Sequence, residues 1–258
     1  MKLTLALFFL SISPQLLSNE SESVIYNTFD SALIGGQAVV DGDYTEVVRI
    51  TDLKSWCTGS LIGPEVLLTA AHCTEPGGYV NFQSKGLVYS AQCRLAPDYT
   101  SSVGDQDMAL CKLESAHPGP YASVATKGPS LLSHVRLIGY GCTKAGGGGG
   151  NDGVLRVGIS MVVKVPTDTY YSFHTRGNVA LCYGDSGGPA FVADQASHHT
   201  VLGVNSRGNI RDTSLMTAVY HPNSVQFMKD FEDEEGVKIC GIGAACGFTD
   251  LDDSSICQ

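Results

Sequence analysis

The chain is built mostly of short strand-like segments separated by glycine and proline turns. It has 258 residues, of which 30 are glycine and 10 proline, with 43% hydrophobic and 16% charged. Short runs of Val, Ile, Leu and Thr broken by turn signals are typical of β-sandwiches and β-barrels. The segments expected as strands are 46–49, 58–69, 80–82, 86–94 and 108–113, then 135–140, 155–165, 179–182, 190–193, 200–205 and 216–220. The pattern predicts an all-β fold of one large or two small domains.

The strand-rich sequence divides into two halves. Residues 118–129 contain three prolines and two glycines and are expected to link the halves. Apolar residues spaced three and four apart predict one helix over 223–235, capped by Asn223 or Ser224. No internal segment is long and apolar enough for a membrane span.

The N-terminus has the pattern of a secretory signal peptide over residues 1–18. A lysine precedes an apolar run, and a small residue, Ser18, ends the segment. An N-terminal anchor remains the alternative, although the apolar run is short for a span and Pro14 soon follows it. A polar, acidic segment, 19–32, then leads into the fold. The net charge of −10 argues against nucleic acid as a partner.

Nine cysteines in a chain with a signal peptide indicate disulfides, and the odd number leaves one thiol free or paired with another chain. Cys57 and Cys73 bracket an expected hairpin. Cys93 and Cys111 lie on consecutive expected strands, so antiparallel pairing could bring them within bridging distance. The tail, residues 236–258, contains Cys240, Cys246 and Cys257. Because the tail has no C-x-x-C pair, a disulfide loop is favoured over a metal site.

The candidate chemistry centres on Ser186 in the stretch 184–189, Gly-Asp-Ser-Gly-Gly-Pro. Glycines beside a serine allow a tight turn that exposes the hydroxyl, although an ordinary surface loop has the same composition. A serine nucleophile needs a base and a group that orients the base. His72 is the candidate base, and Asp107 at the start of an apolar strand is the candidate third member. Asp105 is its competitor and is expected to be a solvated loop charge.

Two segments resemble the motifs of the chymotrypsin/trypsin family of serine endopeptidases. They are 69–73, Thr-Ala-Ala-His-Cys, and 184–189. The order His72, Asp107, Ser186 is also the order of that family, and differs from the order in subtilisins and α/β-hydrolases.

The resemblance extends over residues 33–235 and implies the fold of that family. The expected architecture is two six-stranded antiparallel barrels, at about 33–118 and 129–222, with the active site in the cleft between them. A C-terminal helix at about 223–235 follows, and then the cysteine-containing tail, 236–258.

The resemblance also implies a role for each candidate residue. Ser186 attacks the scissile carbonyl, His72 transfers the proton, and Asp107 orients His72. The backbone amides of Gly184 and Ser186 form the oxyanion hole. Ser206 matches the serine that supports the aspartate, with a plain strand serine as the alternative.

Residues 19–32 then become a propeptide, and Leu33 resembles the new N-terminus that cleavage of a zymogen creates. Its freed ammonium would pair with Asp185 and assemble the oxyanion hole. The chain departs from the family at Ala32, where the family usually has Lys or Arg. We expect cleavage at Ala32–Leu33 by an activator that is not trypsin-like, unless the boundary is displaced.

The resemblance places Ala180 at the floor of the S1 pocket, with Gly208 and Ala218 as its walls. These small, uncharged residues predict a preference for apolar or aromatic P1 side chains over Lys and Arg. The register of Ala218 depends on a loop in which the usual family cysteine is missing.

The missing cysteine leaves Cys182 without its usual partner, and the family fold would place Cys142 nearby. We expect a Cys142–Cys182 disulfide, with a free Cys182 thiol as the alternative. Arg207 replaces an aromatic residue of the family. It could favour acidic substrate residues upstream of the cut or simply face solvent.

The expected partners are polypeptide substrates, an activating protease and protein inhibitors, with neither nucleic acid nor, after signal removal, a membrane. No cofactor and no metal site are expected, because the remaining histidines show no ligand spacing. A non-catalytic binding protein with the same fold and an esterase remain the alternative functions.

Overall fold

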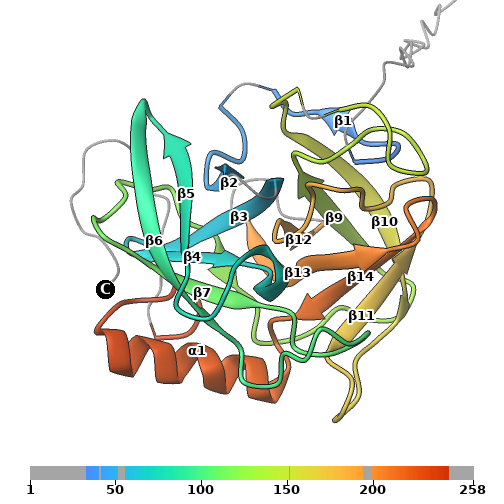
Figure 1. Ribbon diagram of the computed structural model, residues 1–258. Coiled ribbons are helices and arrows are strands. Elements are labelled where there is room, and N and C mark those ends of the chain that lie inside the picture. Colours follow the sequence, from blue (N-terminus) through green and yellow to red (C-terminus); the bar gives the residue numbers. More distant parts are fainter. Residues whose placement is uncertain (1–32, 41, 52–55, 151, 194–198, 244–258) are drawn as a thin grey trace, which may run out of the picture.

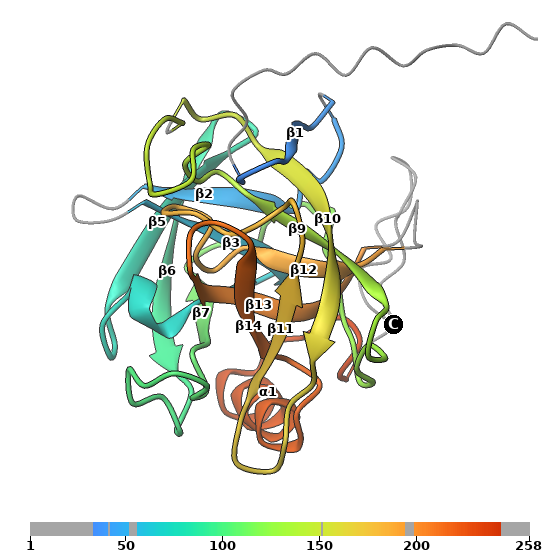
Figure 2. The same ribbon diagram turned by 90° about the vertical axis from the view of Figure 1, so that its right-hand side faces the viewer.

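The computed structural model describes residues 33–40, 42–51, 56–150, 152–193 and 199–243. Two closed antiparallel barrels of six strands each lie side by side (Figure 1, Figure 2). One helix, α1 (Pro222–Glu235), packs against the first barrel. The expected all-β class with two barrels and a C-terminal helix is therefore confirmed. The expected signal peptide and propeptide, and the end of the tail from residue 244, lie outside the described residues.

The first barrel is a ring of strands in the order β2-β3-β4-β7-β6-β5. The strands are β2 (Val47–Thr51), β3 (Trp56–Gly63), β4 (Val66–Thr69), β5 (Tyr79–Ser84), β6 (Leu87–Leu95) and β7 (Ala109–Leu113). Burial alternates along β5, where Val80 and Phe82 point inward and Asn81 is exposed. Ile50 on β2 pairs with Phe82 on β5, and this contact closes the ring.

The second barrel follows the order β9-β10-β11-β14-β13-β12, and β12 pairs with β9 to close it. The strands are β9 (His134–Gly139), β10 (Arg156–Lys164), β11 (Ser172–Arg176), β12 (Pro189–Val192), β13 (Thr200–Gly208) and β14 (Thr213–Ala218). Two further short strands, β1 (Gln37–Ala38) and β8 (Ser123–Val124), pair with β10 and β13. Leu137, Phe173 and Met216 belong to its buried core.

The structure corrects two strand assignments in the second half. Residues 179–182 do not form the expected strand, since their only bridge is the isolated pair Ile34–Ala180 among the described residues. The sixth strand is β11, which the sequence pattern misses because its only large apolar side chain is Phe173. Pairing with β10 on one side and β14 on the other fixes β11 in place.

The N-terminal segment also differs from the expected boundary of the first barrel, because residues 33–38 lie on the second. Leu33 is fully buried in the core of the second barrel. The Ile34 carbonyl accepts a hydrogen bond from the Ala180 amide at 3.0 Å, and β1 pairs with β10. The start of the described chain is thus fixed beside the segment that leads to Ser186.

Helix α1 agrees closely with the expected range, but its cap differs. The His221 ring accepts a hydrogen bond from the Asn223 amide, so His221 rather than Asn223 or Ser224 is the cap. Gly236 ends the helix in the left-handed conformation, with φ of 66°. The buried apolar face consists of Phe227, Met228 and Phe231. Within the described ranges, no helix is long and apolar enough to cross a membrane.

Six of the described cysteines form three disulfides, Cys57–Cys73, Cys93–Cys111 and Cys142–Cys182. The second pair staples facing residues of β6 and β7. The third pair lies next to the Ser186 turn. Cys182 is therefore disulfide-bonded, and the alternative of a free Cys182 thiol is wrong. Cys240 is also disulfide-bonded, and Cys246 and Cys257 lie outside the described residues.

Candidate active site

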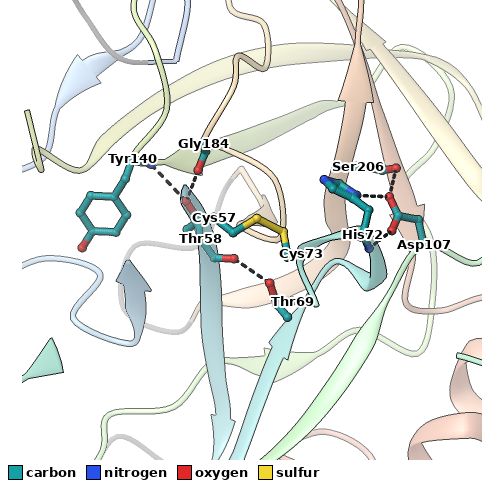
Figure 3. Close-up of a disulfide and its surroundings, with 9 residues drawn as sticks. All are labelled: Cys57, Thr58, Thr69, His72, Cys73, Asp107, Tyr140, Gly184 and Ser206. Carbon is teal, nitrogen blue, oxygen red and sulfur yellow. Dashed lines mark hydrogen bonds and ion pairs between the residues drawn. A yellow bond between two sulfur atoms is a disulfide. The ribbon is translucent and has the colours of Figure 1, made fainter. Parts of the chain in front are cut away.

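Two hydrogen bonds hold His72 against Asp107. His72 lies in a short 3-10 helix (Ala71–Cys73) directly after β4, and Asp107 lies just before β7. One Asp107 oxygen accepts the His72 amide at 3.0 Å, and the other lies 2.8 Å from Nδ1 (Figure 3). Asp107 is fully buried, whereas the His72 side chain is 34% exposed. The pair fixes the ring and leaves Nε2 free of Asp107.

Ser206 supports the same carboxylate from the second barrel. Its hydroxyl donates to Asp107 Oδ2 at 2.5 Å. Ser206 lies at a bulge, because the pairing of β13 with β14 shifts register between Asn205 and Arg207, and bulges redirect side chains. Burial alone would raise the pKa of Asp107, but the hydrogen bonds and charge of His72 and the Ser206 hydroxyl outweigh it. The net pKa lies below its ordinary value, so Asp107 is held as an anion.

Thr58 links the His72 region to the Ser186 turn. Its amide donates to the Ser186 carbonyl at 2.7 Å. Its hydroxyl donates to the Gly184 carbonyl at 2.8 Å (Figure 3). The preceding residue, Cys57, is bonded to Cys73, which follows His72. Although both sulfurs lie near the His72 ring, the disulfide occupies them, and they are not thiolate ligands for a metal. The disulfide and Thr58 therefore set the serine turn relative to the histidine.

The stretch around Ser186 is a tight turn that requires glycine. Gly184 and Gly187 have φ of 98° and 81°, and a side chain is strained in that region. A Cβ on Gly187 would lie 2.1 Å from the Thr69 hydroxyl and 2.3 Å from the Thr58 carbonyl. Ser186 itself is half-buried. Among the described residues, the Ser186 hydroxyl donates no hydrogen bond to His72. Such hydrogen bonds are often long or poorly aligned in active sites without substrate.

Asp185 is a buried carboxylate in a different environment. It is fully inaccessible to solvent, and its oxygens accept the amides of Gly141 and Cys182 at 2.9 and 2.8 Å. Burial raises the pKa of Asp185 to about 7, although these two hydrogen bonds oppose the rise. The Cys142–Cys182 disulfide joins the two segments that supply those amides. The backbone amides that surround Asp185 are therefore held in place by a covalent link.

The residues expected around S1 are only partly brought together. Ala180 is buried, and Gly208 faces Ser214 across the β13–β14 pair. The Leu181 amide donates to the Ser214 hydroxyl at 2.9 Å. Ala218 instead faces Gly203 and is fully buried, so it does not lie opposite Gly208 in the strand pair.

Ser214 is the residue that sequence reasoning misses opposite Gly208. The antiparallel pairing of β13 with β14 could have identified Ser214 as the residue opposite Gly208. The bulge at Ser206, however, shifts the pairing register by one residue, which the sequence does not reveal.

Asp105 is buried, contrary to the expected solvated loop charge. It is 9% exposed, and one carboxylate oxygen accepts the amides of Thr100 and Ser102 at 2.8 and 2.9 Å. Asp107 contacts His72, so the two carboxylates have different hydrogen-bond partners.

Two six-stranded barrels that together supply a serine turn and a histidine–aspartate pair define a serine endopeptidase. The family model described as Trypsin matches residues 33–229. This match covers more than half of the chain, and the chain belongs to the trypsin family of serine endopeptidases.

Curated relatives agree with this assignment. The chain is 28% identical to "Trypsin-like protease" of Streptomyces glaucescens, over 78% of this chain and 81% of that protein. It is 28% identical to "Brachyurin" of Leptuca pugilator, over 61% of this chain and 80% of the relative. It is also 25% identical to "Coagulation factor XII" of Sus scrofa, over 73% of this chain and 37% of that protein.

Proposed function

We propose that this protein is a secreted endopeptidase that cleaves peptide bonds through an acyl-enzyme on Ser186. His72 takes the serine proton and returns it to the leaving amine, while Asp107 orients the ring and stabilises its charged form. The amides of Gly184 and Ser186 stabilise the oxyanion. The proposal rests chiefly on one observation, the doubly hydrogen-bonded His72–Asp107 pair that Thr58 ties to the serine turn.

The test is peptide hydrolysis together with labelling by a fluorophosphonate, which reacts covalently with an activated serine. Ser186→Ala is expected to abolish both signals. Ser130→Ala is the matched control, because Ser130 is exposed and belongs to a distant turn. Folded, correctly processed protein that neither cleaves peptides nor takes the label would instead support a non-catalytic binding protein.

We also propose that cleavage before Leu33 completes the site. Asp185 is buried, accepts two backbone amides and has a raised pKa, so an added cation would stabilise its ionised form. Leu33 is already buried on the same barrel, beside the Ala180 segment. Among the described residues, Asp185 accepts hydrogen bonds from backbone amides and from no charged side chain. An ammonium created at Leu33 would supply a cation for this carboxylate.

N-terminal sequencing of the active protein tests this step. The expected first residue is Leu33, and the activating protease must accept Ala32 at the cut. A different first residue in fully active material would contradict the assignment.

We propose that the S1 pocket accepts uncharged side chains, with apolar or aromatic P1 residues preferred over Lys and Arg. The supporting residues are Ala180, Leu181, Gly208 and Ser214, and none of the four carries a charge. Profiling with a peptide library tests the proposal, and predominant cleavage after Lys or Arg would contradict it.

The signal-like N-terminus and the disulfides support export to an oxidising compartment. The proposed partners are polypeptide substrates, an activating protease and protein inhibitors. Recovery of the mature protein only inside the producing cell would contradict secretion.

A further inference from the structure

We propose that Arg49 and Trp56 form a binding site for an acidic side chain of the substrate, on the C-terminal side of the bond that is cleaved. This inference rests on the proposed function, since it concerns the substrate of the same active site. Arg49 contacts the substrate away from the reacting atoms, so its role is to determine specificity.

Arg49 and Trp56 lie on the face of the first barrel that meets the serine turn. Arg49 on β2 pairs directly with Thr58 on β3, and Trp56 precedes Thr58 by two residues. Side chains of a directly opposed pair, and those two residues apart on a strand, lie on the same face of a sheet. The Thr58 hydroxyl donates to the Gly184 carbonyl at 2.8 Å, so this face is turned toward the Ser186 turn (Figure 3).

The Cys57–Cys73 disulfide places the same face on the side of the leaving group. Trp56 directly precedes Cys57, which is bonded to Cys73. Cys73 directly follows His72, which in the proposed mechanism returns a proton to the leaving amine. The residues proposed for S1, which takes the side chain before the cut, belong instead to the second barrel. A substrate that fills S1 therefore extends toward Trp56 with the residues that follow the cut.

The guanidinium of Arg49 stacks on an exposed aromatic ring. Its central carbon lies 4.8 Å from the centroid of Trp56, and Trp56 is 47% exposed. Gly153 of the second barrel also borders the guanidinium, since a Cβ there would lie 3.2 Å from Arg49 Nη1. Burial raises the pKa of Tyr140, and the charge of Arg49 opposes that rise. The cation therefore lies where the two barrels meet, with an aromatic surface beside it.

Arg49 has no anionic partner among the described residues. It is half-buried, its nitrogens form no ion pair or hydrogen bond there, and its Nε is buried without a partner. Asp152 is the carboxylate next to Gly153, but Arg156 binds both of its oxygens, at 2.9 and 2.7 Å. A guanidinium that is partly withdrawn from water and has no carboxylate favours an anion from outside the chain.

Arg207 also lies beside the site, but its charge is already shared with carboxylates. Its Nη2 lies 3.8 Å from Asp105 Oδ1 and 3.7 Å from Asp107 Oδ2. Its Nε donates to the Ser206 hydroxyl at 3.3 Å, and its Nη1 donates to the Ser101 carbonyl at 3.4 Å. These contacts direct the charge of Arg207 to the chain's own carboxylates, so the preference for an acidic residue is expected after the cut and not before it.

A glutamate or aspartate side chain matches both parts of this site. Its carboxylate can accept charge-assisted hydrogen bonds from the guanidinium, and its methylene groups can lie on the ring of Trp56. An apolar side chain could contact the ring but would leave the guanidinium without an anion. Glutamate should therefore be favoured over glutamine, which has the same shape without the charge, by about tenfold in kcat/KM at one of the first three positions after the cut.

The activity test uses quenched fluorescent peptides that differ only by Glu or Gln at each of the three positions after the cut. Each kcat/KM is divided by that of a p-nitroanilide substrate with the same residues before the cut and none after it. Arg49→Gln should reduce the Glu/Gln ratio from about ten to about one, and Arg49→Lys, which keeps the charge but not the planar fork, should leave about three. Arg176→Gln is the matched control, because Arg176 is an exposed arginine on β11 and its loss changes the net charge equally. The control should keep the parent ratio.

Trp56 supplies a second readout, because it is the only tryptophan of the chain. Its emission in the Ser186→Ala protein therefore reports on this site without any cleavage. The Glu peptide should change the emission at about tenfold lower concentration than the Gln peptide. In Arg49→Gln the two titrations should coincide.

Equal rates for the Glu and Gln peptides at all three positions would overturn the inference, and so would an acid preference that persists in Arg49→Gln. If Arg49→Gln does not fold, Arg49→Lys decides, because a Glu/Gln ratio that lysine leaves unchanged contradicts a role for the guanidinium. A protein that cleaves neither the peptides nor the p-nitroanilide substrate would refute the proposed hydrolysis. The Trp56 titration then decides the inference by itself, and coinciding Glu and Gln curves in the Ser186→Ala protein overturn it.

Discussion

Thr58 provides a sharp test of how the serine turn is held. Its buried hydroxyl donates to the Gly184 carbonyl at 2.8 Å and accepts the Tyr140 amide at 3.2 Å. Thr58→Val keeps the side-chain shape but leaves both backbone groups without this partner. A buried polar group that loses its partner costs about 1–3 kcal/mol. The variant should therefore lose about 2–4 kcal/mol of unfolding free energy.

The matched control is Thr175→Val on β11. Thr175 is also fully buried, but its hydroxyl has no hydrogen-bond partner in the described structure. Replacing it with Val removes an unsatisfied group, so its unfolding free energy should stay the same or increase. Urea unfolding of both variants in the Ser186→Ala background, with disulfides intact, measures the difference.

Activity gives a second readout for Thr58→Val. Because the hydroxyl fixes the peptide that joins Gly184 to Asp185, kcat should fall about tenfold, less than the loss of a direct oxyanion donor. KM should change little. Equal stability losses for Thr58→Val and Thr175→Val would refute the reasoning, since shape rather than hydrogen bonding would then dominate.

Three further predictions follow from other contacts. Gly187→Ala should prevent accumulation of folded protein, because its Cβ would lie 2.1 Å from a hydroxyl; Gly86→Ala shares the positive φ but has nothing within 4 Å, so it should fold with only a small loss of stability. Ser206→Ala should lower kcat/KM about tenfold through loss of a hydrogen bond to a charged acceptor, measured with a peptide substrate. Burial raises the pKa of Asp185 to about 7, so the uncleaved Ser186→Ala protein should lose stability as pH rises from about 4 to 7. Asp185→Asn should remove most of that dependence in urea unfolding.

The sequence predicts most strands because strand propensity and turn residues agree along the chain. It misses β11 because Ser172–Arg176 has one large apolar residue, and only its two neighbouring strands reveal it as part of the barrel. It misplaces a strand at 179–182 because a short apolar run does not distinguish a strand from a buried loop.

The candidate site shows the same division between local and long-range information. His72, Asp107 and Ser206 meet around one carboxylate, as the motifs and the family order suggest. Ser214 could not be found by counting, because the bulge at Ser206 changes which residue of β14 faces Gly208. The contacts of Arg207 with Ser101 and Asp105 likewise join β13 to a loop of the other barrel, which no local pattern indicates.

Two buried carboxylates, Asp107 and Asp185, show how this fold gives one chemical group two different roles. Both are fully buried, and burial by itself raises the pKa of each. Asp107 accepts hydrogen bonds from His72 and Ser206, and these overcome burial and hold it as an anion. Asp185 accepts only two backbone amides among the described residues, and they do not overcome it. Asp107 is therefore ionised in the chain as it stands, whereas the pKa of Asp185 stays raised. Under the proposed activation step, the ammonium of Leu33 would supply the cation that stabilises the ionised form of Asp185.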